Sequence, residues 1–439
     1  IRCHVPELGF GPLFSCKIPV KWEMLLKSPI FDRYQMYFSL ICAKSAQISG
    51  QMDLSIRIVG LPIVLGSCNR IRGGDMAKSN IPNTTFPMNA WYAAAWSHEI
   101  RHELTARMVC GKDMVLYRRD NGDLAALENA CWHRLLPLSL DFLKGDAVVC
   151  GYHGLEFNAA GRCTHMPAQK TINPSAGVQA YPVSERHRLV WVWPGDPAQA
   201  DPAKIPDLHW NDGTDWVGDG GTYYGLKCDY RLIVDNLMDL THETYVHAGS
   251  IGDENITDTP FDVTHSARKA VVTRWMKGIE PPPFWKQNLG KEGLVDRWQI
   301  INFEAPSTIC GDVGVAPVGT GAPEGDRSQG VNGCFLAAIT PATETTCHYF
   351  WNFVRTFKKD DDLLTKAINK AHVNPEGTGL YDQDAFVLEA QQRAIDTNPR
   401  MPFYNLNIDA GALWARRLID RMISDETANL PMRADNAAE

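Results

Sequence analysis

A pair of short motifs, each with one cysteine and one histidine, constrains this chain more than any other feature. Cys131 and His133 form a C-x-H motif, and after sixteen intervening residues Cys150 and His153 form a C-x-x-H motif. Two thiols and two imidazoles can hold a tetrahedral zinc ion, or a 2Fe-2S cluster in the Rieske arrangement, where one iron takes both cysteines and the other both histidines. Zinc ribbons usually repeat C-x-x-C in both loops. One ligand of each kind per motif therefore favours the cluster, with zinc as the alternative.

The composition is that of a globular protein large enough for two or three domains. The chain has 439 residues, of which 44% are hydrophobic and 21% charged, and its net charge is −8. Phosphate recognition needs clustered Lys and Arg, and the sequence has no such cluster. It also has no run of about 18 apolar residues to span a membrane. We expect a cytoplasmic protein that binds neither nucleic acid nor membrane, with its remaining cysteines as buried thiols.

Strand signals recur at short intervals around both motifs. Asn121-Gly122 separates two apolar runs, which indicates a β-hairpin. Residues 189–193 form another apolar run, and Pro-Gly-Asp-Pro at 194–197 then breaks the pattern. We expect this break to close an N-terminal all-β domain, residues 88–197, that carries both motifs.

The second part of the chain changes from strands to helices. Helical periodicity begins at about Asp361 and is clearest in residues 385–395 and 413–423. We predict an α+β fold in which a second domain, residues 198–428, has an antiparallel sheet covered by C-terminal helices and is followed by a tail, residues 429–439. The strand candidates of this domain centre on Tyr224, Val272, Ile300, Leu336 and Tyr349.

The first 87 residues do not fit this organisation. They begin with Ile1 rather than Met, and the segment to Asp75 holds four of the twelve cysteines but neither strand alternation nor a capped helical period. A basic-then-apolar leader with a small-residue cleavage site is also missing. We expect residues 1–87 to be a non-native or disordered upstream extension. A genuine extension with a function of its own is the alternative.

A second group of residues points to a mononuclear metal site. Asn236, Asp239, His242 and His247 lie within twelve residues. On a regular helix the two histidines would be about 140° apart, so they converge on one metal only if the helix bends or loosens between them. Asp239 lies three residues before His242, where it can hydrogen-bond the ring. By spacing alone, two satisfied core or surface histidines are the more common case.

Together these motifs resemble those of the Rieske non-heme iron oxygenases, and most closely the oxygenase subunits of the vanillate O-demethylases. The resemblance runs from about Met88 to Met422. One departure lies in the first motif, where the family usually has Pro and this chain has Trp132. The segments that carry the resemblance outside the Cys-His motifs are 228–232, 235–248, 282–285 and 295–299.

The resemblance implies two metal centres. The four residues of the Cys-His motifs would hold the Rieske cluster, while His242, His247 and one carboxylate would hold iron(II) in a facial triad. Asp384 fits the family's late acidic helix as the carboxylate, and Asp382 is the competing ligand. Stabilisation of the helix dipole would by itself explain acidic residues in a first turn.

The same resemblance implies an activity and partners. The expected reaction is oxidative O-demethylation of a methoxylated aromatic acid, vanillate to protocatechuate plus formaldehyde, with O₂. Asn236 and Asp239 are the expected catalytic residues, and Asp239 would link the iron to the Rieske cluster of a neighbouring subunit in a homotrimer. Electrons would come from NADH through a separate flavin and iron-sulfur reductase, because the chain has no strand followed by a G-x-G-x-x-G dinucleotide motif.

Two alternatives to this function remain open. A Rieske oxygenase of another aromatic acid or aryl methyl ether could carry the same motifs, because a fold does not determine a substrate. A non-catalytic Rieske electron carrier, or a zinc-stabilised scaffold, would lack the mononuclear iron and consume no oxygen. Metal analysis separates these classes, since the demethylase should hold about three iron ions per chain.

Two arginines are candidates for binding the substrate carboxylate. Arg274 and Arg297 each precede a tryptophan on a predicted strand, where alternation turns one member of each pair inward. An exposed Arg beside a core Trp is the more common arrangement, so we expect these arginines to lie at the surface. If either faces inward, it can pair with a carboxylate in an otherwise apolar pocket, and Arg297 ranks first.

The N-terminal segment gives a first testable prediction. A shortened chain that starts at Met76 or Met88 should fold with full iron content and activity, because the preceding residues carry no recognisable motif. Iron content and oxygen uptake of the shortened and full chains would be compared. Loss of soluble protein on removal of residues 1–75 would show that the segment belongs to the fold.

Overall fold

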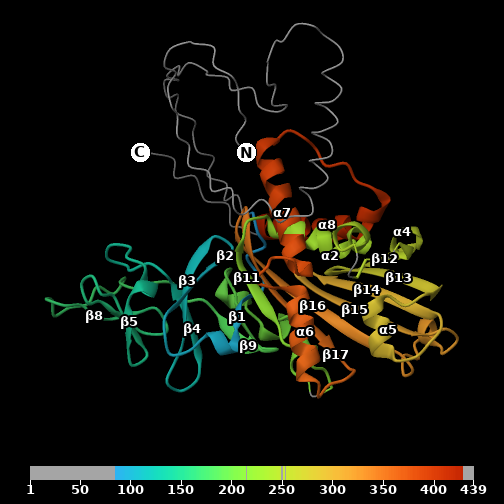
Figure 1. The fold of residues 1–439 in the computed structure, drawn as a ribbon. Coiled ribbons are helices and arrows are strands. Elements are labelled where there is room, and N and C mark those ends of the chain that lie inside the picture. The colour runs from blue at the N-terminus through green and yellow to red at the C-terminus, as the bar shows by residue number, and fades with distance from the viewer. Residues whose placement is uncertain (1–84, 214, 249–250, 253, 429–439) are drawn as a thin grey trace, which may run out of the picture. The chain divides into compact units, whose positions relative to one another are not determined.

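A seven-stranded antiparallel sheet organises the larger part of the fold (Figure 1). The structure is a computed structural model that describes residues 85–428 except 214, 249–250 and 253. The predictions for residues 1–84 and for the tail therefore lie outside the described residues. All the described residues belong to one compact unit.

The strand order of the large sheet is β11-β17-β16-β15-β14-β13-β12. All five predicted strand positions lie in it, whereas β12 and β15 were not predicted. Two glycines weaken the strand pattern of β15, yet packing requires both, because a Cβ at Gly311 would lie 2.0 Å from the Phe335 ring and one at Gly314 2.3 Å from the Trp298 ring. The strands are β11 (Gly221–Leu226), β12 (Phe261–His265), β13 (Lys269–Ile279), β14 (Val295–Glu304), β15 (Thr308–Pro317), β16 (Val331–Thr343) and β17 (Thr346–Arg355).

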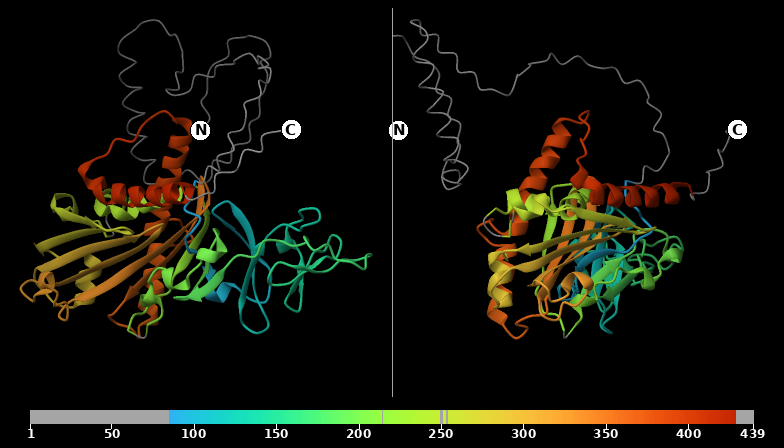
Figure 2. Two further views of the ribbon diagram at one scale, coloured as in Figure 1. Left: turned by 180° about the vertical axis from the view of Figure 1, so that it is seen from behind. Right: turned by 90° about the vertical axis from the view of Figure 1, so that its right-hand side faces the viewer.

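Helices cover one face of this sheet, which confirms the predicted α+β architecture (Figure 2). The helical periods predicted at 385–395 and 413–423 lie in α7 and α8. Helix α2 begins where the Asp229 side chain accepts a hydrogen bond from the N–H of Arg231. The helices are α2 (Tyr230–Met238), α3 (Glu243–Val246), α4 (Asn255–Asp258), α5 (Pro283–Leu289), α6 (Asp362–His372), α7 (Leu380–Thr397) and α8 (Ala410–Ala428). No helix among the described residues is both long and apolar enough to cross a membrane.

The N-terminal region consists of three small antiparallel sheets, as the all-β prediction requires. The predicted hairpin joins β3 and β4, with Gly122 in its turn at a φ of 90°. These strands are β1 (Tyr92–Trp96), β2 (Thr105–Val109), β3 (Lys112–Arg118), β4 (Leu124–Glu128), β5 (Phe142–Lys144), β6 (Ala147–Val149), β7 (Glu156–Phe157), β8 (Cys163–His165), β9 (Val183–Arg186) and β10 (Leu189–Val192). Short 3₁₀ helices are η2 (Ser97–Glu99), η3 (Leu138–Leu140), η4 (Pro197–Gln199), η5 (Pro202–Lys204), η6 (His209–Asn211), η7 (Leu240–His242), η8 (Ala322–Glu324) and η9 (Asn407–Asp409).

The sheet formed by β1, β10 and β9 packs against the second face of the large sheet. Trp91, Trp191 and Trp193 form a buried cluster there with Leu336 and Phe350 of β16 and β17. The large sheet is therefore covered on both faces where β15, β16 and β17 lie, and β17 is buried along almost its whole length. This arrangement leaves the helix-covered face to hold a cavity.

His348 of β17 ties the N-terminal region to the large sheet. Its Nδ1 accepts a hydrogen bond from the N–H of Gly225 at 3.1 Å, and its Nε2 donates to the carbonyl of Met108 in β2 at 3.0 Å. Both ring nitrogens are thus satisfied in the neutral form. Burial lowers the pKa of His348 to about 4.

This histidine should make stability depend on pH. The pKa of His348 is lower in the folded chain than the usual value of about 6.5, so the unfolded chain binds the proton first as the pH falls. Its contribution is complete above about pH 6.5 and is lost toward about pH 4, on the order of 3 kcal/mol. We expect His348→Gln to flatten the pH dependence of the free energy of unfolding in this window, measured by urea titration. An unchanged pH dependence would contradict this account.

Candidate functional site

The Cys-His motifs lie in two loops that share one hydrogen-bond pattern. In the loop between β4 and β5, the N–H of Cys131 donates to the carbonyl of Leu136, and the N–H of Leu135 donates to the carbonyl of Cys131, both at 2.8 Å. The loop between β6 and β7 repeats both bonds around Cys150. The fourth residue after each cysteine has a positive φ, 61° at Leu135 and 72° at Gly154. Leu135 therefore adopts a conformation that only its surroundings can impose.

The four side chains of these loops fit a Rieske cluster. The thiols of Cys131 and Cys150 are buried, whereas the imidazoles of His133 and His153 are exposed. The Nδ1 atoms of the two histidines lie 3.1 Å apart. Burial raises the pKa of the Cys131 thiol to about 11, so only a bound metal would keep it as a thiolate. Two buried sulfur donors and two exposed nitrogen donors suit a Rieske cluster, in which one iron binds both cysteines and the other both histidines.

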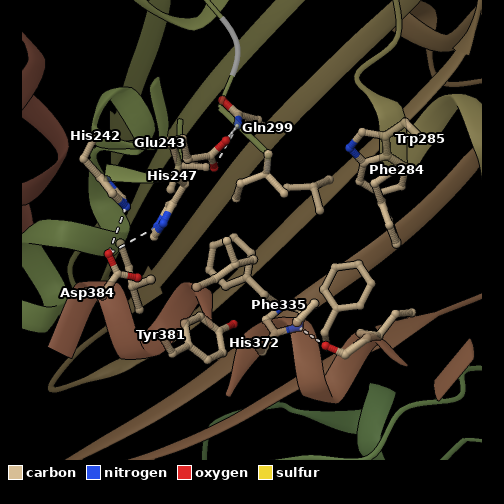
Figure 3. A pocket seen from close by; sticks show the side chains of 18 of the residues that line it. His242, Glu243, His247, Phe284, Trp285, Gln299, Phe335, His372, Tyr381 and Asp384 are labelled. Carbon is tan, nitrogen blue, oxygen red and sulfur yellow. Dashed lines mark hydrogen bonds and ion pairs between the residues drawn. The ribbon is translucent and has the colours of Figure 1, made fainter. Parts of the chain in front are cut away.

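His242 and His247 can converge with Asn236 because helix α2 ends between Asn236 and the two histidines. Helix α2 ends at Met238, and Asp239 is extended, with φ −128° and ψ 103°. A 3₁₀ turn then carries His242, and His247 follows the single turn of α3. On a regular helix the side chains of His242 and His247 would point about 140° apart. The irregular backbone instead turns both imidazole rings toward α7 (Figure 3).

Three side chains meet at this break. The Nε2 atoms of His242 and His247 lie 3.5 and 3.3 Å from the Oδ1 atom of Asp384 in α7. Asn236 donates from its Nδ2 to the same oxygen at 3.2 Å. Burial lowers the pKa of His247, but Asp384 outweighs it, and the pKa is raised. The carboxylate thus favours a positive charge here, and two nitrogens with one oxygen fit an iron(II) facial triad.

The other ring nitrogens are held by acceptors outside the triad. His242 donates from Nδ1 to the backbone carbonyl of Asp239 at 2.6 Å, and His247 pairs through Nδ1 with Oε1 of Gln383 at 3.0 Å. These bonds leave each Nε2 able to serve as a metal ligand. Sequence reasoning missed Gln383, whose position next to Asp384 was the available signal.

The carboxylates of Asp239 and Asp382 accept hydrogen bonds from backbone N–H groups, although their spacing in the sequence suggested a role beside the histidines. The Asp239 side chain accepts from the N–H of Thr241 at 2.9 Å, so its backbone carbonyl, not its carboxylate, holds the His242 ring within the chain. Asp382 accepts from the N–H groups of Gly379 and Asn374, each at 3.0 Å. It therefore caps the start of α7, and the structure places Asp384 rather than Asp382 beside the histidines.

A narrow cavity of about 150 Å³ opens in front of the triad, between the large sheet and helices α2, α5, α6 and α7 (Figure 3). Its walls are mainly apolar and aromatic. They are contributed by Phe284, Trp285, Phe335, Phe353, Ile368 and Leu380, among others. Such a lining suits a small aromatic molecule and excludes water from the metal.

The expectation that both arginines lie at the surface is wrong. Arg274 and Arg297 are each 4% exposed, because helices cover the face of β13 and β14 on which they lie. Arg297 lines the cavity and pairs with Glu243 at 3.3 Å. Gln299 donates to the same carboxylate from Nε2 at 3.2 Å. Burial raises the pKa of Glu243, and Arg297 opposes that shift.

Arg274 lies behind this group rather than in the cavity. It forms hydrogen bonds with Gln299 at 3.4 Å and Thr241 at 3.3 Å, and it lines a second, very small cavity together with Asp239. Sequence reasoning missed Glu243, which follows directly after a histidine ligand candidate. It also missed His372, a buried histidine that lines the cavity from the end of α6.

Comparisons with known proteins match both parts of the chain. The model of the Rieske [2Fe-2S] domain matches residues 90–182, and that of the vanillate O-demethylase oxygenase C-terminal domain matches residues 226–425. A vanillate O-demethylase oxygenase subunit of Pseudomonas sp. (strain ATCC 19151) is 43% identical, over 73% of this chain and 97% of that protein. A toluene-4-sulfonate monooxygenase iron-sulfur subunit of Comamonas testosteroni is 38% identical, over 78% of this chain and 98% of that protein.

A solved structure extends the comparison to the fold. The crystal structure of dicamba monooxygenase bound to 3,6-dichlorosalicylic acid has 32% sequence identity and a TM-score of 0.72, over 78% of this chain and 99% of that one. Together with the Rieske domain and the three-ligand site, such neighbours assign a 2Fe-2S cluster and a mononuclear iron as cofactors. The zinc and electron-carrier alternatives are thereby excluded. The chain belongs to the vanillate O-demethylase oxygenase family of Rieske non-heme iron oxygenases.

Proposed function

We propose that this oxygenase removes the methyl group of vanillate, giving protocatechuate and formaldehyde. The observation that carries the proposal is the position of His242, His247 and Asp384 in the wall of an aromatic cavity that also holds a buried arginine. The names of two relatives at 43% and 40% identity support the same substrate. Other relatives are named for toluene-4-sulfonate and dicamba, so another substituted aromatic acid is the alternative.

In this proposal the chain's residues prepare both centres. His242, His247 and Asp384 hold the mononuclear iron, which when bound supplies the activation of O₂. The Nδ1 hydrogen bonds keep both Nε2 lone pairs directed at the metal, and Asn236 orients the carboxylate. The four residues of the Cys-His motifs hold the Rieske cluster.

Arg297 is the proposed partner of the substrate carboxylate. A guanidinium has five N–H donors in one plane, a geometry that matches carboxylates such as that of Glu243. The apolar walls strengthen this attraction because they exclude water. Arg274 ranks second, since it lines only the smaller cavity behind.

Electron supply requires other proteins and other copies of the chain. A separate NADH-dependent reductase with a flavin and an iron-sulfur centre would reduce the cluster. In a homotrimer, Asp239 would connect His242 to the cluster of the neighbouring subunit. The geometry supports this role, because Oδ2 of Asp239 has no hydrogen-bond partner among the described residues and the side chain is partly exposed.

The proposed domains are a Rieske domain at 88–197 and a catalytic domain at 198–428, preceded by the extension. Phe86, just before this division, is buried beside Tyr230, with ring centroids 6.3 Å apart. A shortened chain starting at Met76 keeps this contact, and one starting at Met88 loses it.

The reaction can be tested directly. With NADH and a matching reductase, vanillate should yield formaldehyde equimolar with protocatechuate, because the hydroxylated methyl group leaves as formaldehyde. Both products would be quantified by chromatography against oxygen consumed, with 4-hydroxybenzoate, which lacks the methoxy group, as the control. Ring hydroxylation with the methoxy group retained would refute the proposal.

Asp239→Asn tests the proposed link between the centres. The Asn side-chain oxygen can still cap Thr241, so the fold around His242 should persist while the charge is lost. We expect the Rieske spectrum and much of the iron to remain and most turnover to disappear. The measurement is single-turnover oxidation of the prereduced cluster with vanillate and O₂. Oxidation at the wild-type rate would show that Asp239 only caps its helix.

A further inference from the structure

His372 lines the cavity and has one ring nitrogen without a hydrogen-bond partner among the described residues. It is the last residue of α6, and its Nδ1 donates to the backbone carbonyl of Ile368 at 2.8 Å. Since a carbonyl can only accept, Nδ1 carries the hydrogen and Nε2 of the neutral ring is an acceptor. Apart from Ile368, no described residue forms a hydrogen bond with this ring.

Aromatic neighbours hold this ring in place. His372 stacks on Trp351, with centroids 5.7 Å apart and an interplanar angle of 17°, and on Phe353 at 5.5 Å. Tyr381 packs against it at 5.0 Å. Burial lowers the pKa of His372 to about 4, so the ring is neutral at physiological pH. The ring is therefore held in one position, is neutral and carries its hydrogen on Nδ1, which leaves Nε2 as an acceptor.

The cavity is polar at two ends that differ in character. Figure 3 shows Glu243 and Gln299 at one end and His372 with Tyr381 at the other, while the triad lies to one side. The first end holds the Glu243–Arg297 pair, and the proposed function places the substrate carboxylate at this arginine. The second end offers an acceptor among aromatic rings, and an unpaired acceptor in such surroundings is satisfied only by a donor on the ligand.

We propose that Nε2 of His372 accepts a hydrogen bond from the phenolic hydroxyl next to the methoxy group, and so selects methoxyphenols over other aryl methyl ethers. This inference rests on the proposed demethylation. In vanillate the hydroxyl is para to the carboxylate, which matches two polar groups at opposite ends of the cavity. The methoxy group, ortho to the hydroxyl, then faces the triad. An aryl ether without the hydroxyl leaves Nε2 buried without a partner.

The test compares vanillate with 3-methoxybenzoate, which lacks only the hydroxyl. For the wild-type enzyme with its reductase we expect kcat/KM to be about 10- to 100-fold higher for vanillate. In His372→Phe this ratio should fall to near one, mainly through loss on vanillate. His372→Gln, whose side-chain oxygen is again an acceptor, should recover part of the ratio.

Binding provides a readout that does not depend on turnover. Calorimetry of the iron-loaded enzyme without O₂ should show the same preference for vanillate, and the same loss in His372→Phe. His348→Gln is the matched control, because His348 is also buried and neutral but both its nitrogens are bonded away from the cavity. The control should keep the wild-type ratio.

Two results separate the inference from the function on which it rests. Equal kcat/KM values for both substrates in the wild-type enzyme, with formaldehyde formed from each, would overturn the role of His372 and leave the demethylation intact. Absence of formaldehyde from both substrates would overturn the demethylation itself. If His372→Phe does not fold, the wild-type ratio and His372→Gln still decide the question.

Discussion

The active site depends on a break in one helix. If α2 continued regularly past Met238, His242 and His247 would point in directions about 140° apart and could not share a ligand. The extended residue Asp239 prevents this and contributes in two ways, since its carbonyl holds the His242 ring and its carboxylate caps the following turn. A metal site of two histidines and one carboxylate follows from this local irregularity.

The cavity depends on a second constraint, the burial of both faces of the large sheet. The N-terminal region covers one face with tryptophans, so the other face can combine helices with an enclosed space. Charges in that space must be paired, because an isolated buried charge is strongly unfavourable. Glu243 and Arg297 satisfy this requirement for each other, and Gln299 completes the group. Polar groups at the site are therefore few and fixed in direction.

The two metal centres differ in how the backbone prepares them. In the Rieske loops the same pair of backbone hydrogen bonds is used twice, and each loop delivers one buried thiol and one exposed imidazole. At the candidate mononuclear site the three side chains come from segments far apart in the chain, and Asp384 is a buried residue in the first half of α7. One centre is thus local in sequence and the other is assembled by tertiary packing.

The sequence by itself predicted the candidate ligands of both centres, five of the seven strands of the large sheet and the C-terminal helical periods. Residues such as Cys131, His133 and the Asn121-Gly122 turn act through local geometry, which neighbouring residues already specify. Only the tertiary structure placed Asp384 rather than Asp382 beside the two histidines, showed that Arg297 is buried, and identified the acceptor atom of His372. These outcomes depend on which face of a strand or helix is covered by an element distant in the chain, and no local period contains that information.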